Sequence, residues 1–360
     1  GIADLSVGNV LYDAVVQLDA ETARSAYDQL SGEIYATTAT GLIGDSRHIR
    51  DATLGRLRTS FDSVGSSVTP MLVDGPNGAA PAPGMPDTGM TLWGSVFGSW
   101  NQASSDGNAA ELDQTAGGLI LGADGMLDNW RLGIAAGYGQ SDLSVYDRRS
   151  SASSNNYHFG LYGGTDWGDI AFRGGLAYTL SEIGTDRAVD FTGFDNMLSA
   201  NYSAETIQAF GEFVHTIETG FAVFEPFVNF AHVNVRTHGF TESGGAGTLS
   251  VDARTNSATF TTLGVRAQAD MSLGDTSGTF TGMVGWKHAF GNETPLSTQA
   301  FSGGDRFTVA GAPIAQDSAV VEAGLDLDLG ETATFGLSYH GQFNPDVQSH
   351  GFSAKLGVKF

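Results

Sequence analysis

The sequence lacks cysteine, long hydrophobic runs and an excess of basic residues, and each absence excludes a class of protein. With Cys 0 in 360 residues, the chain forms neither disulfides nor thiolate metal sites. No apolar run reaches the ~18 residues that a transmembrane helix needs, so such a helix is excluded. The formal net charge of -23 leaves no basic patch to neutralise a phosphate backbone, which argues against nucleic acid as a partner.

Glycine, by contrast, is abundant. The chain has 50 glycines, which is roughly twice the usual ~7% usage, without a collagen period or long low-complexity tracts. Glycine weakens helices and ordinary strands, but it suits places where backbones approach closely or where a sheet bends sharply. The composition therefore favours a barrel wall, which needs both. The chain begins with Gly1 and no signal peptide precedes it, so we expect a fragment or a processed form.

Three segments of different periodicity follow one another. Residues 1–64 carry apolar residues at spacings of three and four, which predicts helices, with Ser46 as the cap of the second one. Residues 65–88 are rich in Gly, Pro and Ala and are predicted to be a linker. If extended, this linker is long enough to cross a bilayer core of ~30 Å. Residues 89–360 have a period of two, which predicts β-strands.

The alternation is clearest in WRLGIAAGYGQ, where Trp130, Leu132 and Ile134 share one face and Arg131 and Gly133 share the other. Alternation alone also fits a soluble sandwich. The strand candidates, however, are long, at about ten or more residues against a usual ~5–6. Their polar faces consist mainly of small residues, which suits a narrow lumen. We predict twelve strands, near 91–101, 112–126, 129–145, 154–167, 169–183, 199–216, 220–237, 248–272, 277–291, 315–329, 332–343 and 350–360.

The connections between these strands alternate in length. Short turns such as 127–129 and 167–169 alternate with longer polar stretches such as SDLSVYDRRSSASSNN (141–156) and GTDRAVDFTGFDNML (184–198). Outer-membrane barrels have short periplasmic turns and longer extracellular loops. The fold class that follows is an all-β transmembrane barrel of twelve antiparallel strands, closed, with an N-terminal helical segment of which part lies in the lumen.

Parity along the strands assigns charged side chains to the lumen. The predicted lumen-facing residues are Arg131, Arg173, Glu212, Arg266, Lys287, Glu322, Asp326, Asp328 and Lys355. A cluster of arginines on the second helix is predicted to pair with the acids among them and to plug the pore. The members of this cluster are Arg47, Arg50, Arg56 and Arg58. Salt screens such pairs less in a confined pore than on a surface, although charge desolvation opposes them. The alternative places this helix outside the barrel and leaves only the linker in the lumen.

Catalytic and metal-binding motifs are missing from the sequence. No HExxH, P-loop or GxSxG pattern occurs, and Asp326 and Asp328 have strand spacing without the other ligands of a calcium loop. We therefore predict no cofactor, no metal and no enzymatic activity in this chain itself. A barrel enzyme stays open as an alternative, because several carboxylates and a histidine lie in loop-like places. These residues are Asp142, Asp147, Asp186, Asp190 and His238.

The stretch from Trp93 to Phe360 closely resembles the translocator β-domain of bacterial autotransporters, the type V secretion systems. The motifs that carry the resemblance are WGSVFGSW, GGLILGAD, LGIAAGYGQS, FEPFVNFAHV, VGWKHAFGN, FSGGDRFTVAGAPIAQDSAVVEAGLD, LSYHGQF and the final GFSAKLGVKF. They follow one another in order over about three quarters of the chain. The upstream stretch LSGEIYATTATGLIGDSRHIRDATLGRLR also looks like the helical segment that precedes such barrels.

The resemblance implies an outer-membrane translocator that exports its own N-terminal passenger to the cell surface and anchors it there. Implied partners are outer-membrane lipid and lipopolysaccharide, periplasmic chaperones and the barrel-assembly machinery, with the barrel itself a monomer. The assembly signal of the family falls on Phe352, Leu356, Val358 and Phe360. A stand-alone outer-membrane pore or adhesin barrel is the alternative.

Some members of the family cut off their passenger between two adjacent asparagines inside the barrel. The Asn-Asn pair of this sequence is Asn155-Asn156, which lies between the third and fourth strand candidates and not before the barrel. We therefore expect no self-cleavage, and a passenger that is either retained or cut by another protease.

Overall fold

The computed structural model describes residues 1–61, 74–75, 78–79, 90–273, 276–291, 293–328 and 333–358. Most of the predicted linker and the last residue, Phe360, lie outside these ranges. The elements before the large sheet are η1 (Ile2–Asp4), α1 (Val10–Val15), α2 (Ala20–Leu30), α3 (Ile34–Asp45), α4 (Arg47–Ser60), β1 (Asp74–Gly75) and β2 (Gly78–Ala79).

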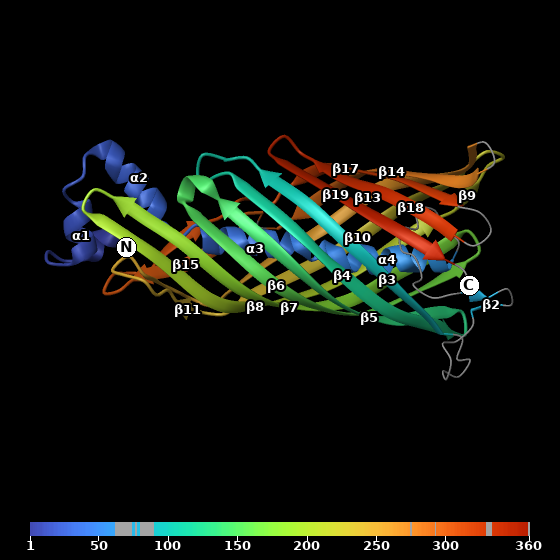
Figure 1. The fold of residues 1–360 in the computed structure, drawn as a ribbon, viewed down its shortest axis with the longest axis horizontal. Coiled ribbons are helices and arrows are strands. Elements are labelled where there is room, and N and C mark those ends of the chain that lie inside the picture. The colour runs from blue at the N-terminus through green and yellow to red at the C-terminus, as the bar shows by residue number, and fades with distance from the viewer. Residues whose placement is uncertain are drawn as a thin grey trace.

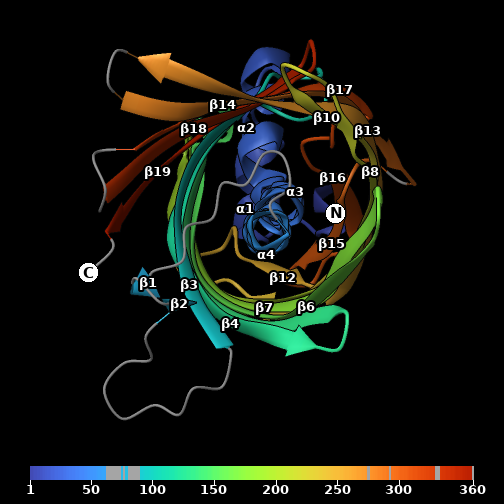
Figure 2. The same ribbon diagram turned by 90° about the vertical axis from the view of Figure 1, so that its right-hand side faces the viewer.

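Within the described residues, twelve long antiparallel strands form a closed barrel, which confirms the predicted fold class (Figures 1 and 2). Each strand pairs with its neighbours in sequence, and β19 pairs with β3 to close the ring. A two-residue strand, β9 (Ile217–Glu218), pairs with the first residues of β10. The barrel strands are β3 (Met90–Ala103), β4 (Leu112–Leu127), β5 (Trp130–Val145), β6 (Ser150–Trp167), β7 (Ile170–Phe191), β8 (Phe194–His215), β10 (Val223–Thr237), β13 (Arg254–Leu273), β14 (Thr276–Phe290), β17 (Asp317–Asp328), β18 (Ala333–Phe343) and β19 (Val347–Val358).

The period of two in the sequence becomes two faces of the barrel wall. Apolar side chains such as Ile134, Leu161 and Val284 point outward, each with 60% or more of its surface exposed. The alternate residues of the strands point into the lumen, and one of them, Arg173, is fully buried. A hydrophobic outer face with polar groups inside is the arrangement that a lipid environment selects.

The prediction of long loops is wrong for two of the connections between strands. Residues 184–198 are mostly strand, since β7 and β8 continue to Phe191 and Phe194 and meet in a tight turn at Gly193. Likewise β5 and β6 extend over most of 141–156, leaving only the short helix η2 (Tyr146–Arg148) and the residue after it between them. Burial continues to alternate through both extensions, so their many polar residues face either the lumen or solvent. Asp142, Asp186 and Asp190 therefore lie on strands, not in loops.

The two longest connections between barrel strands fold into a second sheet of their own. Its order is β11-β12-β15-β16, and its strands are β11 (Phe240–Thr241), β12 (Leu249–Val251), β15 (Leu296–Phe301) and β16 (Phe307–Ala310). This sheet lies at the end of the barrel where α1, α2 and the N-terminus are found (Figure 1). The short turns, the start of β3 and the end of β19 lie at the opposite end.

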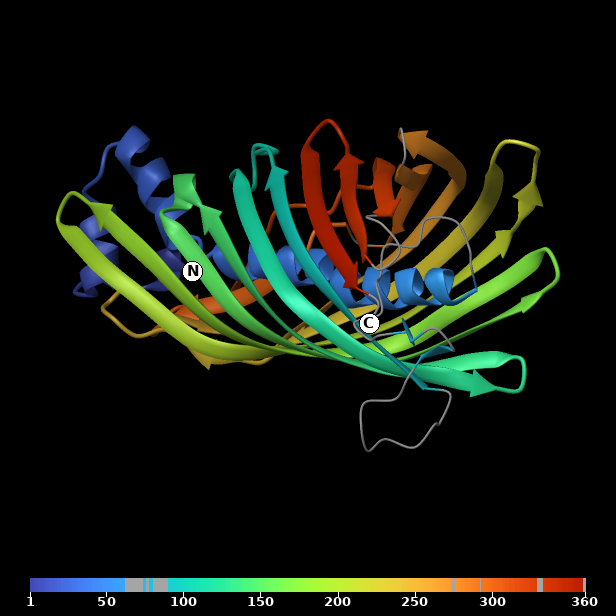
Figure 3. The ribbon, with the colours of Figure 1, turned by 45° about the vertical axis from the view of Figure 1, so that its right-hand side comes forward.

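Helices α3 and α4 run along the inside of the barrel (Figures 2 and 3). Ser46 alone separates them and keeps a right-handed helical conformation, so the two helices act as one rod. The Ser46 hydroxyl donates to the Ile43 carbonyl at 2.7 Å, a contact at the end of α3, where we had predicted a cap for the next helix. In the described part of the chain, no helix has both the length and the apolar character to cross a membrane.

Candidate functional site: the barrel lumen and its helix

A close ionic contact between α4 and the barrel is centred on Asp124 of β4. Arg56 donates to both carboxylate oxygens at 2.7 and 2.9 Å, and Arg131 of β5 donates at 2.6 Å. The Tyr162 hydroxyl adds a bond of 2.9 Å and itself accepts from the Trp93 indole N–H at 2.5 Å. The side chain of Asp124 is completely buried. Two guanidinium groups and a phenol thus hold one carboxylate, and one of these groups belongs to the helix.

A second ionic centre surrounds Glu212 of β8. Arg266 of β13 donates to both oxygens at 3.2 and 2.6 Å, and Arg173 of β7 donates at 3.3 Å. Arg58 of α4 approaches within 3.9 Å. Arg173 also lies 3.8 Å from the carboxylate of Glu225 on β10. These charges come from four barrel strands and the helix, and all are nearly or fully buried.

Polar contacts continue along α3 toward the other end. Asp45 accepts from the Ser141 hydroxyl at 2.6 Å and from the Gln114 amide at 3.0 Å. Nearby, His48 of α4 lies 3.6 Å from Asp45 and 3.4 Å from Ser99, but the same ring atom, Nε2, makes both contacts. A catalytic relay needs the two ring nitrogens to face different partners. This arrangement of Ser, His and Asp is therefore structural.

At the N-terminal end, a buried ionic group holds the start of α3 to a loop. Arg187 of β7 binds Glu242 with two hydrogen bonds, at 2.9 and 2.7 Å, and donates to the Gln29 carbonyl at 2.7 Å. The Tyr35 hydroxyl of α3 donates to the same carboxylate. Glu242 lies in the loop that carries β11 and β12, so this loop is fixed over the helix.

The second long loop also contacts α3. The Ala312 backbone N–H donates to the Thr37 hydroxyl at 3.1 Å, and the Ala312 carbonyl accepts from the Thr40 hydroxyl at 2.6 Å. On the opposite side, Glu33 accepts from Arg148 at 2.6 Å and from the Ala110 amide at 2.9 Å. The helix is thus held by loops on more than one side where it leaves the barrel.

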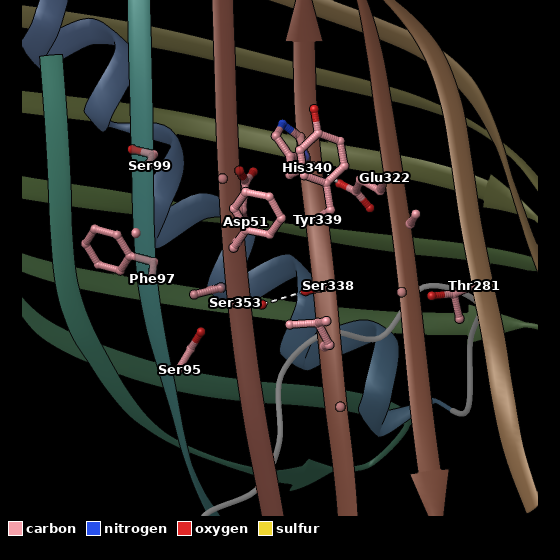
Figure 4. A pocket seen from close by; sticks show the side chains of 18 of the residues that line it. Asp51, Ser95, Phe97, Ser99, Thr281, Glu322, Ser338, Tyr339, His340 and Ser353 are labelled. Atoms are coloured by element: carbon pink, nitrogen blue, oxygen red, sulfur yellow. Dashed lines mark hydrogen bonds and ion pairs between the residues drawn. The ribbon is translucent and has the colours of Figure 1, made fainter. Parts of the chain in front are cut away.

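In the described part of the chain, cavities lie beside α4 on two sides. One, of about 140 Å³, lies between the helix and β17, β18, β19 and β3; its lining includes Asp51, Glu322, His340 and Ser353 (Figure 4). The other, of about 80 Å³, lies toward β10, β13 and β14. The helix therefore leaves space along one part of the wall.

The structure places the predicted lumen residues as follows. Arg131 and Arg173, together with Glu212 and Arg266, take part in the two ionic centres. Lys287, Glu322 and Asp326 line the cavities. Asp328 and Lys355 lie on β17 and β19, and their side chains fall outside the described part.

The four predicted plug residues all lie on α4 inside the barrel. Arg56 and Arg58 contact the carboxylates of Asp124 and Glu212, whereas Arg47 and Arg50 donate to neutral amide oxygens.

Of the predicted assembly signal, Phe352 is described, and its ring faces outward with 52% of its surface exposed. Leu356 and Val358 are described as backbone on β19, and Phe360 lies outside the described residues.

The predicted site residues did not include Asp124, Asp45 or the group formed by Tyr35, Arg187 and Glu242. Asp124 had a usable signal, because it alternates with the outward-facing Leu121 and Ala123 positions of GGLILGAD. Among the residues considered for catalysis, Asp190 of β7 lies 3.1 Å from Arg149, and the His238 ring bonds the Ser203 hydroxyl at 3.0 Å. No group of three or more His, Asp or Glu in the described residues could hold a metal ion.

A family model for the autotransporter beta-domain matches residues 92–340. This chain belongs to the autotransporter family. Among solved structures, the translocator domain of the autotransporter NalP from Neisseria meningitidis matches with a TM-score of 0.65 and 14% identity, covering 91% of this chain and 100% of that one. The transport unit of the autotransporter AIDA-I from Escherichia coli matches with a TM-score of 0.57 and 12% identity, covering 78% and 93%.

Curated relatives match the N-terminal helical segment of this chain as well as its barrel. An extracellular serine protease of Serratia marcescens is 32% identical over 361 aligned positions, which cover 99% of this chain and 33% of that protein. The autotransporter chain thus spans about a third of the length of the curated relatives it matches. Family and fold together place the barrel in the outer membrane as a translocator for a passenger.

Proposed function

We propose that this translocator exports a passenger joined to its N-terminal side, anchors it at the cell surface, and then keeps α3 and α4 in the lumen as a plug. The observation that carries the proposal is the buried contact of Arg56 with Asp124, because it joins the helix to the wall deep inside the barrel. The direction of the chain supports it too, since the N-terminal helices lie at the end opposite the short turns (Figure 1).

Planar-bilayer recordings test the plug. We expect residues 65–360 to conduct far more than residues 1–360, since the deleted helices occupy the lumen. Equal conductance of the two proteins, both shown to be folded by heat-modifiable migration on gels, would contradict the plug.

Protease treatment of intact cells tests export. An epitope tag placed before Gly1 should be removed by a protease that cannot cross the outer membrane, while the barrel survives. If the tag is protected until the cells are lysed, the alternative of a stand-alone pore with a periplasmic helical extension is favoured.

The names of the curated relatives suggest a class of passenger. Because the protein that is 32% identical over 99% of this chain is an extracellular serine protease, we propose a secreted serine protease as the passenger. The coding sequence upstream of Gly1 tests this, since a protease domain with its catalytic serine motif should be encoded there. We propose that the barrel is a monomer contacting lipid and lipopolysaccharide, assembled by chaperones and the barrel-assembly machinery; cross-linking in cells tests each partner.

Self-cleavage is not part of the proposed mechanism. Asn155 and Asn156 lie on β6, and the Asn156 amide bonds the hydroxyls of Ser141 and Ser154 at 3.2 and 3.1 Å. We expect the purified protein alone to generate no new N-terminus within residues 40–90. Terminal sequencing after prolonged incubation tests this, and a new terminus in that range would contradict it.

A further inference from the structure

The smaller cavity beside α4 carries more positive than negative charge. Five basic side chains and three carboxylates line it. The basic side chains are Arg47, Arg50, Arg58, Arg266 and Lys287, and the acidic ones are Asp51, Glu212 and Glu322. Two of these carboxylates are already engaged, since Glu212 is bound by Arg266 and Glu322 lies 3.1 Å from His340. The surplus positive charge therefore falls on Arg47, Arg50 and Lys287.

The Lys287 side chain is held in place without a carboxylate partner among the described residues. It donates to the Gln342 carbonyl oxygen at 3.1 Å and lies 4.4 Å above the centre of the Phe260 ring. The Gln342 amide donates to the Ser318 hydroxyl at 3.1 Å, which turns the amide oxygen toward the lysine. An ammonium group has three N–H donors. In the described part of the chain, no carboxylate forms an ion pair with Lys287.

Arg47 and Arg50 lie on the same face of α4, because residues three apart are neighbours on a helix. Arg47 donates to the Asn101 side-chain oxygen at 3.2 Å, and Arg50 donates to the Gln208 side-chain oxygen at 3.0 Å. Both partners are neutral. The nearby acid is Asp51, 3.8 Å from Arg50 and half-exposed to the cavity. Among the described carboxylates that line this cavity, Asp51 is thus the one left to face Arg47, Arg50 and Lys287.

We propose that this cavity binds a small inorganic anion, such as chloride, between Lys287 and the guanidinium groups of Arg47 and Arg50. Ammonium and guanidinium groups carry only hydrogen-bond donors, so they suit an anion and reject a cation. The volume of about 80 Å³ holds a halide together with water. Binding at this site goes beyond the proposed plug. Its effect on ion flow rests on that proposal, because ions would have to pass the helix on this side.

Bromide, which mimics chloride and scatters X-rays anomalously, tests the site directly. Crystals of the full chain soaked in sodium bromide should show an anomalous peak in the cavity. The peak should vanish in Lys287→Gln. The matched control is Arg306→Gln, which removes one positive charge from an exposed loop pair with Asp252 and should keep the peak. A wild-type crystal without a peak, or a peak that survives Lys287→Gln, overturns the proposal.

Ion selectivity supplies a second readout. In bilayers under a KCl gradient, the intact chain should show a reversal potential that favours chloride. Lys287→Gln should lower the ratio of chloride to potassium permeability about twofold or more, whereas Arg306→Gln leaves it unchanged. If Lys287→Gln does not fold, Arg50→Gln replaces it in both experiments. A selectivity that favours potassium overturns the proposal. Failure of the plug is seen separately, as a conductance equal to that of residues 65–360.

Discussion

The enclosed helix α4 contacts the two halves of the barrel wall differently. Toward β4–β7 the helix packs directly on the wall: a Cβ built on Gly160 would lie 3.1 Å from Ile49, and Arg56 bonds Asp124 at 2.7 Å. Toward β10–β19 the same helix borders cavities of about 80 and 140 Å³.

The helical period of α4 explains this difference, because it places different residues toward each half of the wall. Ile49 and Arg56, seven residues apart, lie on the stripe that meets the close wall, whereas Arg47, Asp51 and Arg58 form a stripe that borders the cavities. On the close wall, charges are buried and directly bonded, so they fix the depth and rotation of the helix. On the open wall, Arg58 lies 3.9 Å from Glu212 and Asp51 is half-exposed, so the helix charges on this side are held less closely. One stripe thus positions the helix in the lumen, while the other leaves room for solvent and ions.

Removing the carboxylate of Asp124 should have the largest effect. Asp124→Asn leaves the guanidinium groups of Arg56 and Arg131 buried without a countercharge, which typically costs about 3–5 kcal/mol. We expect a fall of that size in the free energy of unfolding, measured by urea titration of the barrel in lipid vesicles. Bilayer conductance should rise as well, because the helix loses its anchor. An unchanged conductance and stability would show that the close wall does not hold the helix.

Glu242→Gln should release the N-terminal end of the enclosed helix α3. The substitution leaves Arg187 buried beside a neutral amide, at a cost of about 3 kcal/mol. Because Glu242 lies in a loop, we expect the loss to appear locally, as faster proteolysis of residues 238–253 at constant barrel stability. Arg306→Gln, at an exposed loop pair, is the control and should not change the cleavage rate. Equal cleavage rates in all three proteins would refute a role for Glu242 as a clamp.

The strand pattern could be predicted from the sequence because it depends on neighbouring residues. The ionic centres could not be predicted, because they join residues that are far apart in the sequence. Alternation of Ile183, Thr185 and Arg187 toward the lumen continues the strand β7 where its polar composition suggested a loop. The alternation of inward-facing and outward-facing residues is thus a better guide to the ends of the strands in this barrel than composition is. The same parity marks Asp124 as inward-facing.

The partner of Asp124 could not be predicted in the same way. Arg56 and Asp124 are 68 residues apart, and their pairing depends on how deep the helix sits and how it is rotated in the lumen. Neither property is encoded in a local period. Glu242 shows the same limit, since nothing in its loop sequence indicates that it folds inward onto Arg187.

Gly160→Val should disturb the close wall without changing charge. The added side chain meets Ile49, and overpacking of this kind costs about 1–3 kcal/mol. The matched control is Gly351→Val on β19, which borders the larger cavity, where a new Cβ would have ordinary contacts at 3.4 Å or more. We expect the urea midpoint to fall for Gly160→Val and to change little for Gly351→Val. Equal losses at the two glycines would mean that the walls do not differ in packing.

Asp51→Asn should have the smallest effect on stability, because Asp51 lies on the open stripe with 52% of its side chain exposed. Substitutions at such positions usually stay within ±0.5 kcal/mol or so, so we expect the urea midpoint of this variant to match the wild type. Its ion selectivity should change even so, since Asp51 is the carboxylate beside Arg50. Without it, the reversal potential should move further toward chloride. A large loss of stability would place Asp51 among the groups that hold the helix, and the contrast between the two stripes of α4 would then fail.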